Sequence, residues 1–142
     1  MKRLAIGVSL IVALVTGGFA SAHGGTITAF SSTGVKFSGG TYSFDPWPCT
    51  SACSGGHWSG MNWSGFLYDT QVDGNAVFIQ SKVDGYGWSA TTYHTKDATS
   101  GKYLTRKTTA GADPAQTGRL HICRDRGALL PNNCADSAVL RR

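Results

Sequence analysis

Two tryptophans and a histidine lie close together in Ser54–Gly65, which reads SGGHWSGMNWSG and repeats Trp-Ser-Gly after five residues. Exposed indole rings in a glycine-rich loop can stack on the apolar face of a sugar ring. These residue types predict a ligand-binding platform made of His57, Trp58 and Trp63. The alternative is that Trp58, Met61 and Trp63 fold inward and cap one end of a small core, which needs large apolar side chains.

A second candidate site is His23, which becomes the first residue if a leader is removed after Ala22. A terminal amine and an imidazole together suit Cu(II), and one further histidine would complete the ligand set. The histidines available for that role are His57, His94 and His121. Removal after Ala20 would instead leave Ser21 first, and His23 would then be an incidental residue of a frayed terminus.

No motif in the chain predicts catalysis. Neither Ser59 nor Ser64 lies in a Gly-x-Ser-x-Gly sequence, and no pair of acidic residues stands out as a glycosidase pair. The oxygen ligands of Asp69, Asp73 and Asn75 lack the alternating spacing of a calcium loop. We therefore expect a non-enzymatic protein, for which copper is the one cofactor that the sequence suggests.

Four cysteines in an exported chain of this size predict two disulfides, for which three connectivities exist. We favour the local pairs Cys49–Cys53 and Cys123–Cys134, because each lies beside turn-forming residues. Cys49, Cys53 and His57 also have the spacing of metal ligands on a helix, but Pro48 and the oxidising compartment favour a disulfide.

The segment between the last two cysteines, CRDRGALLPNNC, places Arg124 and Arg126 in a loop that a disulfide would close. A constrained, protruding loop of this kind could engage a protease, so an extracellular enzyme inhibitor is a further hypothesis. In the alternative interpretation the loop is a stapled turn, and Leu129 and Leu130 plug the core.

The elements that must position these residues are predicted to be β-strands. In Gln71–Trp88 the tripeptide Val-Asp-Gly occurs twice, and Asp-Gly between alternating apolar residues is typical of two-residue hairpin turns. Turns at Asp73-Gly74 and Asp84-Gly85 predict a three-stranded meander in which Ile79 faces Tyr68 and Ala90. Its apolar face would collect Phe66, Tyr68, Val72, Val77, Ile79, Val83, Tyr86, Trp88 and Ala90. Its polar face would collect Asp69, Gln71, Gln80, Lys82, Ser89 and Thr91.

Further short segments have the β-branched and aromatic content of strands, and no window shows helical periodicity. These segments are Thr26–Phe30, Val35–Phe37, Thr41–Phe44, Tyr103–Thr109 and Arg119–Cys123. Pro46–Gly65 has little strand pattern and is expected to be an extended loop tied by Cys49–Cys53. The predicted fold is all-β, an antiparallel β-sandwich or a small barrel-like fold with two local disulfides.

Residues 1–22 have the pattern of a secretory signal peptide, with basic Lys2 and Arg3, an apolar run from Leu4 to Val15, and a small-residue cleavage site. The apolar run is too short to span a bilayer, so we expect secretion without membrane insertion. Residues 23–142 would then form a single extracellular domain.

The charge of the chain is mildly basic and dispersed. Subtracting Lys2 and Arg3 from the formal net charge of +5 leaves +3, and no helix or run concentrates it. This argues against nucleic acid as a partner. A monomer that binds an extracellular glycan or protein is expected.

The spaced motifs Tyr68-Asp69-Thr70, Val72-Asp73-Gly74 and Val83-Asp84-Gly85-Tyr86 are followed by Cys123-Arg124-Asp125-Arg126-Gly127 and Pro131-Asn132-Asn133-Cys134. In this combination the chain resembles a group of small secreted actinobacterial β-rich proteins of unknown function. The resemblance covers about half of the chain, from Gly65 to Cys134. It implies export and a β fold, and it carries no catalytic residue over to this sequence.

Overall fold

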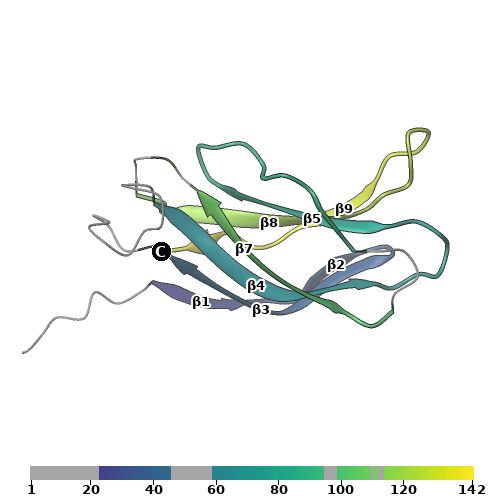
Figure 1. Ribbon diagram of the computed structural model, residues 1–142, viewed down its shortest axis with the longest axis horizontal. Coiled ribbons are helices and arrows are strands. Elements are labelled where there is room, and N and C mark those ends of the chain that lie inside the picture. Colours follow the sequence, from purple (N-terminus) through teal and green to yellow (C-terminus); the bar gives the residue numbers. More distant parts are fainter. Residues whose placement is uncertain (1–22, 46–58, 95–98, 110, 112–113) are drawn as a thin grey trace, which may run out of the picture.

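The computed structural model describes residues 23–45, 59–94, 99–109, 111 and 114–142. In these residues the chain forms ten β-strands arranged in two antiparallel sheets that face each other (Figure 1). The predicted all-β antiparallel sandwich is therefore confirmed, and the sheets do not close into a barrel. The predicted signal peptide and the Cys49–Cys53 pair lie outside the described residues.

The first sheet, sheet A, contains the strands β1 (Gly24–Ile27), β2 (Phe30–Ser32), β3 (Val35–Phe44), β4 (Gly60–Asp69) and β7 (Lys102–Thr109). Its strand order is β1-β3-β4-β7, and β2 pairs with β3 on the same side as β1. Two segments predicted as separate strands, Val35–Phe37 and Thr41–Phe44, are one continuous strand, with a register irregularity between Ser38 and Thr41. Part of the predicted loop Pro46–Gly65 is also wrong, because Gly60–Gly65 belongs to β4.

The second sheet, sheet B, contains β5 (Val77–Val83), β6 (Thr92–His94), β8 (Thr117–Arg124), β9 (Asn133–Asp136) and β10 (Leu140–Arg141). Its strand order is β10-β8-β5-β6, and β9 also pairs with β8. In Figure 1 sheet B lies above sheet A, and the loop between β8 and β9 projects from one end of the sandwich. None of the described residues forms a helix that is long and apolar enough to cross a membrane.

The core fills the space between the two sheets. Each sheet contributes every second side chain, as expected for strands with one covered face. The largest fully buried apolar side chains of sheet A are Phe37, Phe44, Met61 and Leu67, and those of sheet B are Ile79, Leu120, Ile122, Val77 and Val83. The ring of Phe37 packs directly over Gly65, where a Cβ atom would lie 2.3 Å from its Cζ. A glycine is therefore required at this position of β4.

Hydrogen bonds also join the sheets. The hydroxyls of Ser81 on β5 and Thr108 on β7 lie 2.5 Å apart in the buried space between them. Nearer the edge, the Tyr42 hydroxyl of β3 donates to the carbonyl of Arg141 on β10 at 3.0 Å. These bonds satisfy polar groups within or beside the core, where an unpaired donor or acceptor is costly.

The first Val-Asp-Gly copy does not form the predicted hairpin. Because β4 pairs with β3 and β7 while β5 pairs with β6 and β8, Asp73-Gly74 lies in a connection that crosses between the sheets. The turn chemistry itself is present: Gly74 has a φ of 77°, and the Asn75 amide donates to Asp73 Oδ1 at 3.0 Å. The prediction of a three-stranded meander is wrong, because β4 and β5 do not pair with each other and belong to different sheets.

The second Val-Asp-Gly copy does form a tight turn. The amide of Tyr86 donates to the carbonyl of Val83 at 3.0 Å, and Gly85 has a φ of 94°. The pairing of β5 with β6 is shifted by two residues from the predicted register, so Ile79 lies opposite Thr92 instead of Ala90. A shift of two residues keeps every side chain on its own face.

The predicted apolar face is therefore correct for β5 and wrong for its neighbours. Val77, Ile79 and Val83 are buried, as expected. The residues of that predicted face that are instead exposed are Phe66, Val72, Tyr86, Trp88 and Ala90. Conversely, Asp69 was predicted on the polar face and is buried at the end of β4, where its Oδ1 accepts a bond from the Gln71 amide.

Candidate functional site

The predicted tryptophan platform is only partly described by the structure. His57 and Trp58 lie outside the described residues. Trp63 lies in β4 with 3% of its surface exposed, and its ring packs edge-on against Phe37 at a centroid distance of 6.1 Å. Trp63 and Met61 are therefore core residues, and the Trp63 ring is not exposed for stacking. The platform made with His57 and Trp58 stays a prediction.

The histidines of the copper hypothesis have different surroundings, and His57 lies outside the described residues. His23 is exposed, and its carbonyl accepts a bond from the Phe44 amide at the start of sheet A. His94 is buried on the inner face of β6, with Nε2 3.2 Å from the Ser100 carbonyl oxygen. His121 contacts Asp136. Among the described residues, the one cluster of three or more metal-ligating side chains does not include His23.

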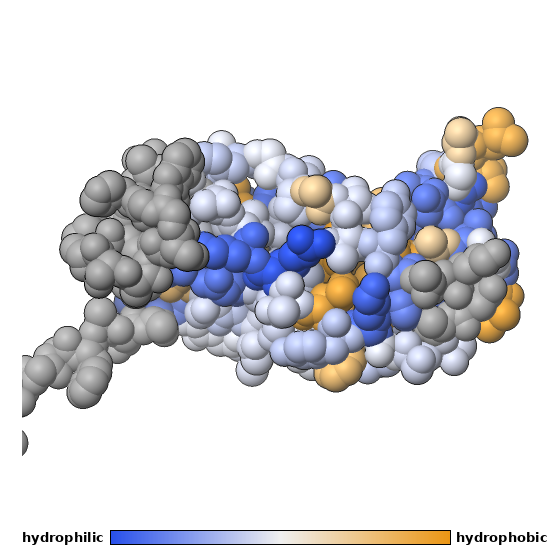
Figure 2. Space-filling view, viewed as in Figure 1, coloured by the Kyte–Doolittle hydropathy of each residue, from blue (hydrophilic) through white to orange (hydrophobic). Residues whose placement is uncertain are grey.

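The arginines of the proposed inhibitor loop have different surroundings. Arg124 forms an ion pair with Asp73, and its side chain is largely buried. Arg126 donates its amide to the Asn132 side chain within the loop. The loop is closed by the Cys123–Cys134 disulfide, as predicted. Leu129 and Leu130 are exposed at its tip, so the expectation that they plug the core is wrong; an apolar tip stands out in Figure 2.

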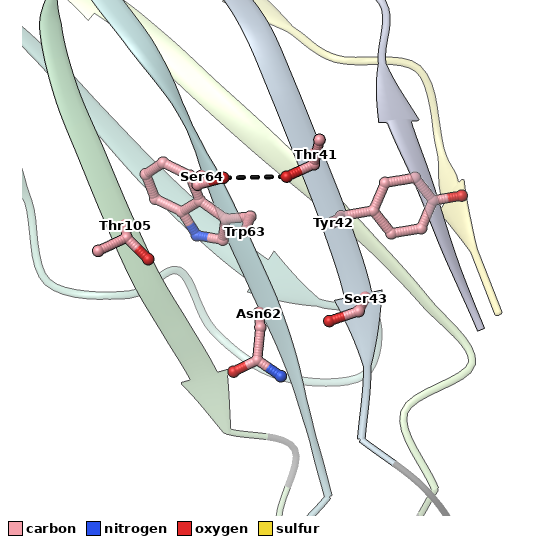
Figure 3. Close-up of a pocket in the computed structure, with 7 residues that line it drawn as sticks. All are labelled: Thr41, Tyr42, Ser43, Asn62, Trp63, Ser64 and Thr105. Atoms are coloured by element: carbon pink, nitrogen blue, oxygen red, sulfur yellow. Dashed lines mark hydrogen bonds between the residues drawn. The ribbon is translucent and has the colours of Figure 1, made fainter. Parts of the chain in front are cut away.

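The outer face of sheet A holds a polar site among the described residues. A hollow of about 230 Å³ is lined by Thr41, Tyr42, Ser43, Asn62, Trp63, Ser64 and Thr105. Because side chains alternate along a strand, five of these residues share the outer face. We call these five, Thr41, Ser43, Asn62, Ser64 and Thr105, the polar row (Figure 3).

The polar row follows directly from the strand register. Thr41 and Ser43 of β3 lie opposite Ser64 and Asn62 of β4, and Ser64 lies opposite Thr105 of β7. The hydroxyls of Thr41 and Ser64 are 3.0 Å apart (Figure 3). Hydroxyl and amide groups can both donate and accept hydrogen bonds, so this row can bind a ligand that has many hydroxyls.

An ion pair anchors one end of the polar row. Asn62 Nδ2 donates to Asp45 Oδ1 at 2.8 Å, and Lys107 Nζ lies 2.9 Å from Asp45 Oδ2. Asn62 and Lys107 are themselves opposite each other in the β4–β7 ladder. The carboxylate therefore holds both side chains in place, and the amide oxygen of Asn62 remains on the outer face.

The other end of the row leads into exposed aromatic rings. Phe66 follows Ser64 on the outer face of β4, and Tyr103 precedes Thr105 on β7; the two aromatic residues lie opposite each other. Their ring centroids are 5.1 Å apart, and the Phe66 and Tyr68 rings are 6.3 Å apart. Phe66 and Tyr103 are 38% and 56% exposed. We call Phe66, Tyr68 and Tyr103 the aromatic patch.

The opposite surface, the outer face of sheet B, carries a different cluster. His121 Nδ1 lies 2.5 Å from Asp136 Oδ1, and its ring is 5.1 Å from that of Trp88. Lys82 Nζ lies 4.8 Å from the Trp88 ring centroid. His121, Cys123 and Cys134 have their potential metal-ligating atoms within 4.8 Å of one another, but the two sulfurs are bonded to each other.

Sequence reasoning missed the aromatic patch because it gave β4 the wrong phase. Phe66 and Tyr68 were placed in the core, which assigned their neighbour Leu67 to the outside. The signal that was available is the run Met61, Trp63 and Leu67, whose large apolar side chains alternate with the polar Asn62 and Ser64. Extending that alternation puts Phe66 and Tyr68 on the outer face.

The outer face of sheet A thus presents the polar row and, next to it along β4 and β7, the aromatic patch. The described residues of these two groups include no pair arranged for acid–base or nucleophilic chemistry. Groups of these kinds can contact a ligand through hydrogen bonds and ring stacking. No protein-family model matches the chain, and no significant match was found among the curated proteins or the solved structures.

Proposed function

We propose that the protein is an extracellular, non-enzymatic carbohydrate-binding protein, and that the outer face of sheet A is its binding surface. The observation that carries the proposal is the continuity of the polar row with the aromatic patch along β4 and β7. Export is the expectation drawn from residues 1–22. Cell-surface or cell-wall glycans are then the class of ligand that such a domain meets.

The aromatic patch supplies the apolar part of the proposed contact. One face of a pyranose ring presents C–H groups, which pack on an aromatic ring and remove apolar surface from water. Phe66 and Tyr103 are neighbours across the β4–β7 ladder, and their rings pack edge to face at an interplanar angle of 61°. Gly39 places no side chain beside the Phe66 ring, where an added Cβ would lie 3.5 Å from it.

The polar row supplies the hydrogen bonds. Residues two apart on one face of a strand are spaced by about 6.6 Å, which lets one chain of sugar units lie over both the aromatic patch and the polar row. Ser64 and Thr105 are the next outward-facing residues along β4 and β7 from Phe66 and Tyr103. Flat, open surfaces of this kind fit an extended polysaccharide better than a small molecule, which prefers an enclosed pocket.

The test is affinity electrophoresis in gels that contain soluble β-glucan, α-glucan, mannan or xylan, together with sedimentation with insoluble chitin and peptidoglycan. We expect retardation or co-sedimentation with at least one of these polysaccharides. Replacing Phe66 and Tyr103 together by alanine should weaken that binding at least tenfold, because the stacking surface is lost.

Tyr93→Ala is the matched control, because Tyr93 is an equally exposed aromatic residue (51%) on the outer face of sheet B. It should bind like the unaltered protein. Two results would overturn the proposal: absence of binding to every polysaccharide tested, or equal loss of binding in Tyr93→Ala and in the Phe66/Tyr103 variant. Capture of a protein partner by the same face, without polysaccharide binding, would also overturn it.

A further inference from the structure

The Cys123–Cys134 disulfide lies on the outer face of sheet B with a histidine in contact with one of its sulfurs. Cys123 on β8 and Cys134 on β9 are directly opposite each other in the ladder. Their surroundings differ: Cys123 is 1% exposed, whereas Cys134 is exposed at the sheet edge. A thiol in solution can therefore approach the sulfur of Cys134 but not that of Cys123.

His121 is positioned against the buried sulfur. It precedes Cys123 by two residues on β8, so the two side chains share a face. Its Nε2 lies 2.9 Å from Cys123 Sγ, and its Nδ1 lies 2.5 Å from Asp136 Oδ1. Asp136 is directly opposite His121 in the β8–β9 ladder, so the register itself brings the carboxylate to the ring.

Both ring nitrogens of His121 thus face acceptors. A disulfide sulfur has no hydrogen to donate, and an ionised carboxylate can only accept. A neutral imidazole carries one N–H and can donate a hydrogen bond to only one of these two partners, whereas an imidazolium can donate to both. With an N–H on Nε2, the ring is a proton donor directly beside the sulfur that would become a thiolate if the disulfide opened.

We propose that Cys123–Cys134 is a redox-active disulfide that exchanges with a dithiol reductant, with His121 as the acid for the leaving sulfur. The thiolate of the dithiol attacks exposed Cys134 Sγ and forms a mixed disulfide, while the Cys123–Cys134 bond breaks. Its electron pair passes to Cys123 Sγ, which takes the proton from His121 Nε2. Protonation of the leaving sulfur lowers the barrier, because a sulfur that leaves as a neutral thiol is a better leaving group than one that leaves as a thiolate.

The second thiol of the reductant completes the reaction. It loses its proton, attacks the mixed disulfide, and releases Cys134, which takes up a proton from solvent. His121 regains its proton from solvent. The dithiol is thereby oxidised to its disulfide, and the protein gains two electrons and two protons, so the exchange balances. Asp136 is a positioning residue: it holds the imidazole through Nδ1.

The test uses the full secreted chain in its oxidised form. Dithiothreitol opens the disulfide, iodoacetamide traps the thiols at intervals, and peptide mass spectrometry follows Cys123 and Cys134 separately from Cys49 and Cys53. His121→Phe keeps a ring and removes the proton donor, and it should slow opening at least tenfold. Asp136→Asn should slow it by a smaller factor.

Gln80→Ala is the control for packing. Gln80 lies opposite His121 on β5, and its amide donates to the Ser89 carbonyl and not to the sulfurs. Opening in this variant should stay within twofold of the unaltered protein. Circular dichroism establishes that each variant is folded before its rate is compared.

The pH profile gives a readout that a merely structural role would not change. The measured rate of disulfide opening is divided by the concentration of dithiothreitol thiolate. The pH dependence that remains then comes from the protein. The charged groups facing His121 are Asp136 from β9, Lys82 beside Trp88 from β5, and Arg119 on β8 itself. Histidines change charge between about pH 5 and 8, so the corrected rate should fall as the pH rises.

In His121→Phe the corrected rate should not vary with pH. A corrected rate that is independent of pH in the unaltered protein would overturn the proposal, even if His121→Phe failed to fold. Equal slowing in His121→Phe and Gln80→Ala would also overturn it and leave the disulfide as a structural staple.

Discussion

At the scale of single residues, Gly65 is the position of β4 where the fold tolerates no side chain. An added Cβ would lie 2.3 Å from Phe37 Cζ, within the fully buried core. We expect Gly65→Ala to lower the free energy of unfolding by about 1–3 kcal/mol, the usual cost of overpacking a core. Urea denaturation followed by circular dichroism measures this change.

Gly87→Ala is the control for this substitution, since an added Cβ at Gly87 meets nothing within 4 Å. It should be neutral, or stabilising by about 0.4–1 kcal/mol, because alanine restricts the unfolded chain. Equal destabilisation by both substitutions would show that Phe37 does not require a glycine at position 65.

A second prediction at this scale concerns the hydroxyl pair that joins the sheets. Ser81→Ala leaves the Thr108 hydroxyl buried without its partner, which should cost about 1–3 kcal/mol. Thr108→Val should have a similar cost. Because the two hydroxyls bond to each other, the double variant should lose less than the sum of the two single variants, as measured in a double-mutant cycle. Additive costs would contradict a direct bond.

At the scale of elements, the connection between β4 and β5 is fixed by charge as well as by turn chemistry. Asp73 forms an ion pair with Arg124 at the end of β8 and also accepts the Asn75 amide bond within the turn. The Asp125 amide donates to the carbonyl of Ala76 nearby. The connection that crosses between the sheets is thereby attached to sheet B.

Two substitutions of Asp73 separate these contributions. Asp73→Asn keeps an oxygen for the Asn75 amide and removes the charge, whereas Asp73→Ala removes both. We expect a loss of about 1–2 kcal/mol for the alanine variant and a smaller loss for the asparagine variant, because charged hydrogen bonds are worth more than neutral ones. Equal losses in urea denaturation would mean that the charge contributes nothing.

Edge strands are a further feature at this scale. β7 is the outer strand of sheet A, and Lys102, Arg106 and Lys107 lie along it, all exposed. A hydrophilic band lies over β7 in Figure 2. Charged side chains on an exposed edge oppose pairing with a second sheet, which is a common way to prevent edge-to-edge aggregation.

At the scale of the whole molecule, the end of the described chain completes the core. Leu140 on β10 is buried among the core residues. β10 lies far from the first strands in sequence and pairs with β8. Leu140→Ala should lower the free energy of unfolding by about 2–5 kcal/mol. Leu129→Ala, at a residue 95% exposed, should change it by less than about 0.5 kcal/mol. Similar effects at the two positions would contradict this division between core and loop tip.

Local chemistry is what the sequence by itself determined. Short strands separated by turn residues predicted an all-β sandwich, positive φ at Gly74 and Gly85 follows from Asp-Gly turns, and Cys123 pairs with the cysteine that lies eleven residues further along. The inward side of β5 was also predictable, because Val77, Ile79 and Val83 alternate with polar residues. These features depend on residues close together in the chain.

Only the tertiary structure decided which strands are neighbours. A strand has two edges, and nothing within β4 specifies that β3 and β7, rather than β5, will occupy them. The predicted pairing of β4 with β5 had placed Phe66 in the core, whereas in the structure Phe66 is exposed and Trp63 is buried. The candidate binding face arises from the long-range pairing of β3, β4 and β7, which the free energy of the assembled core selects.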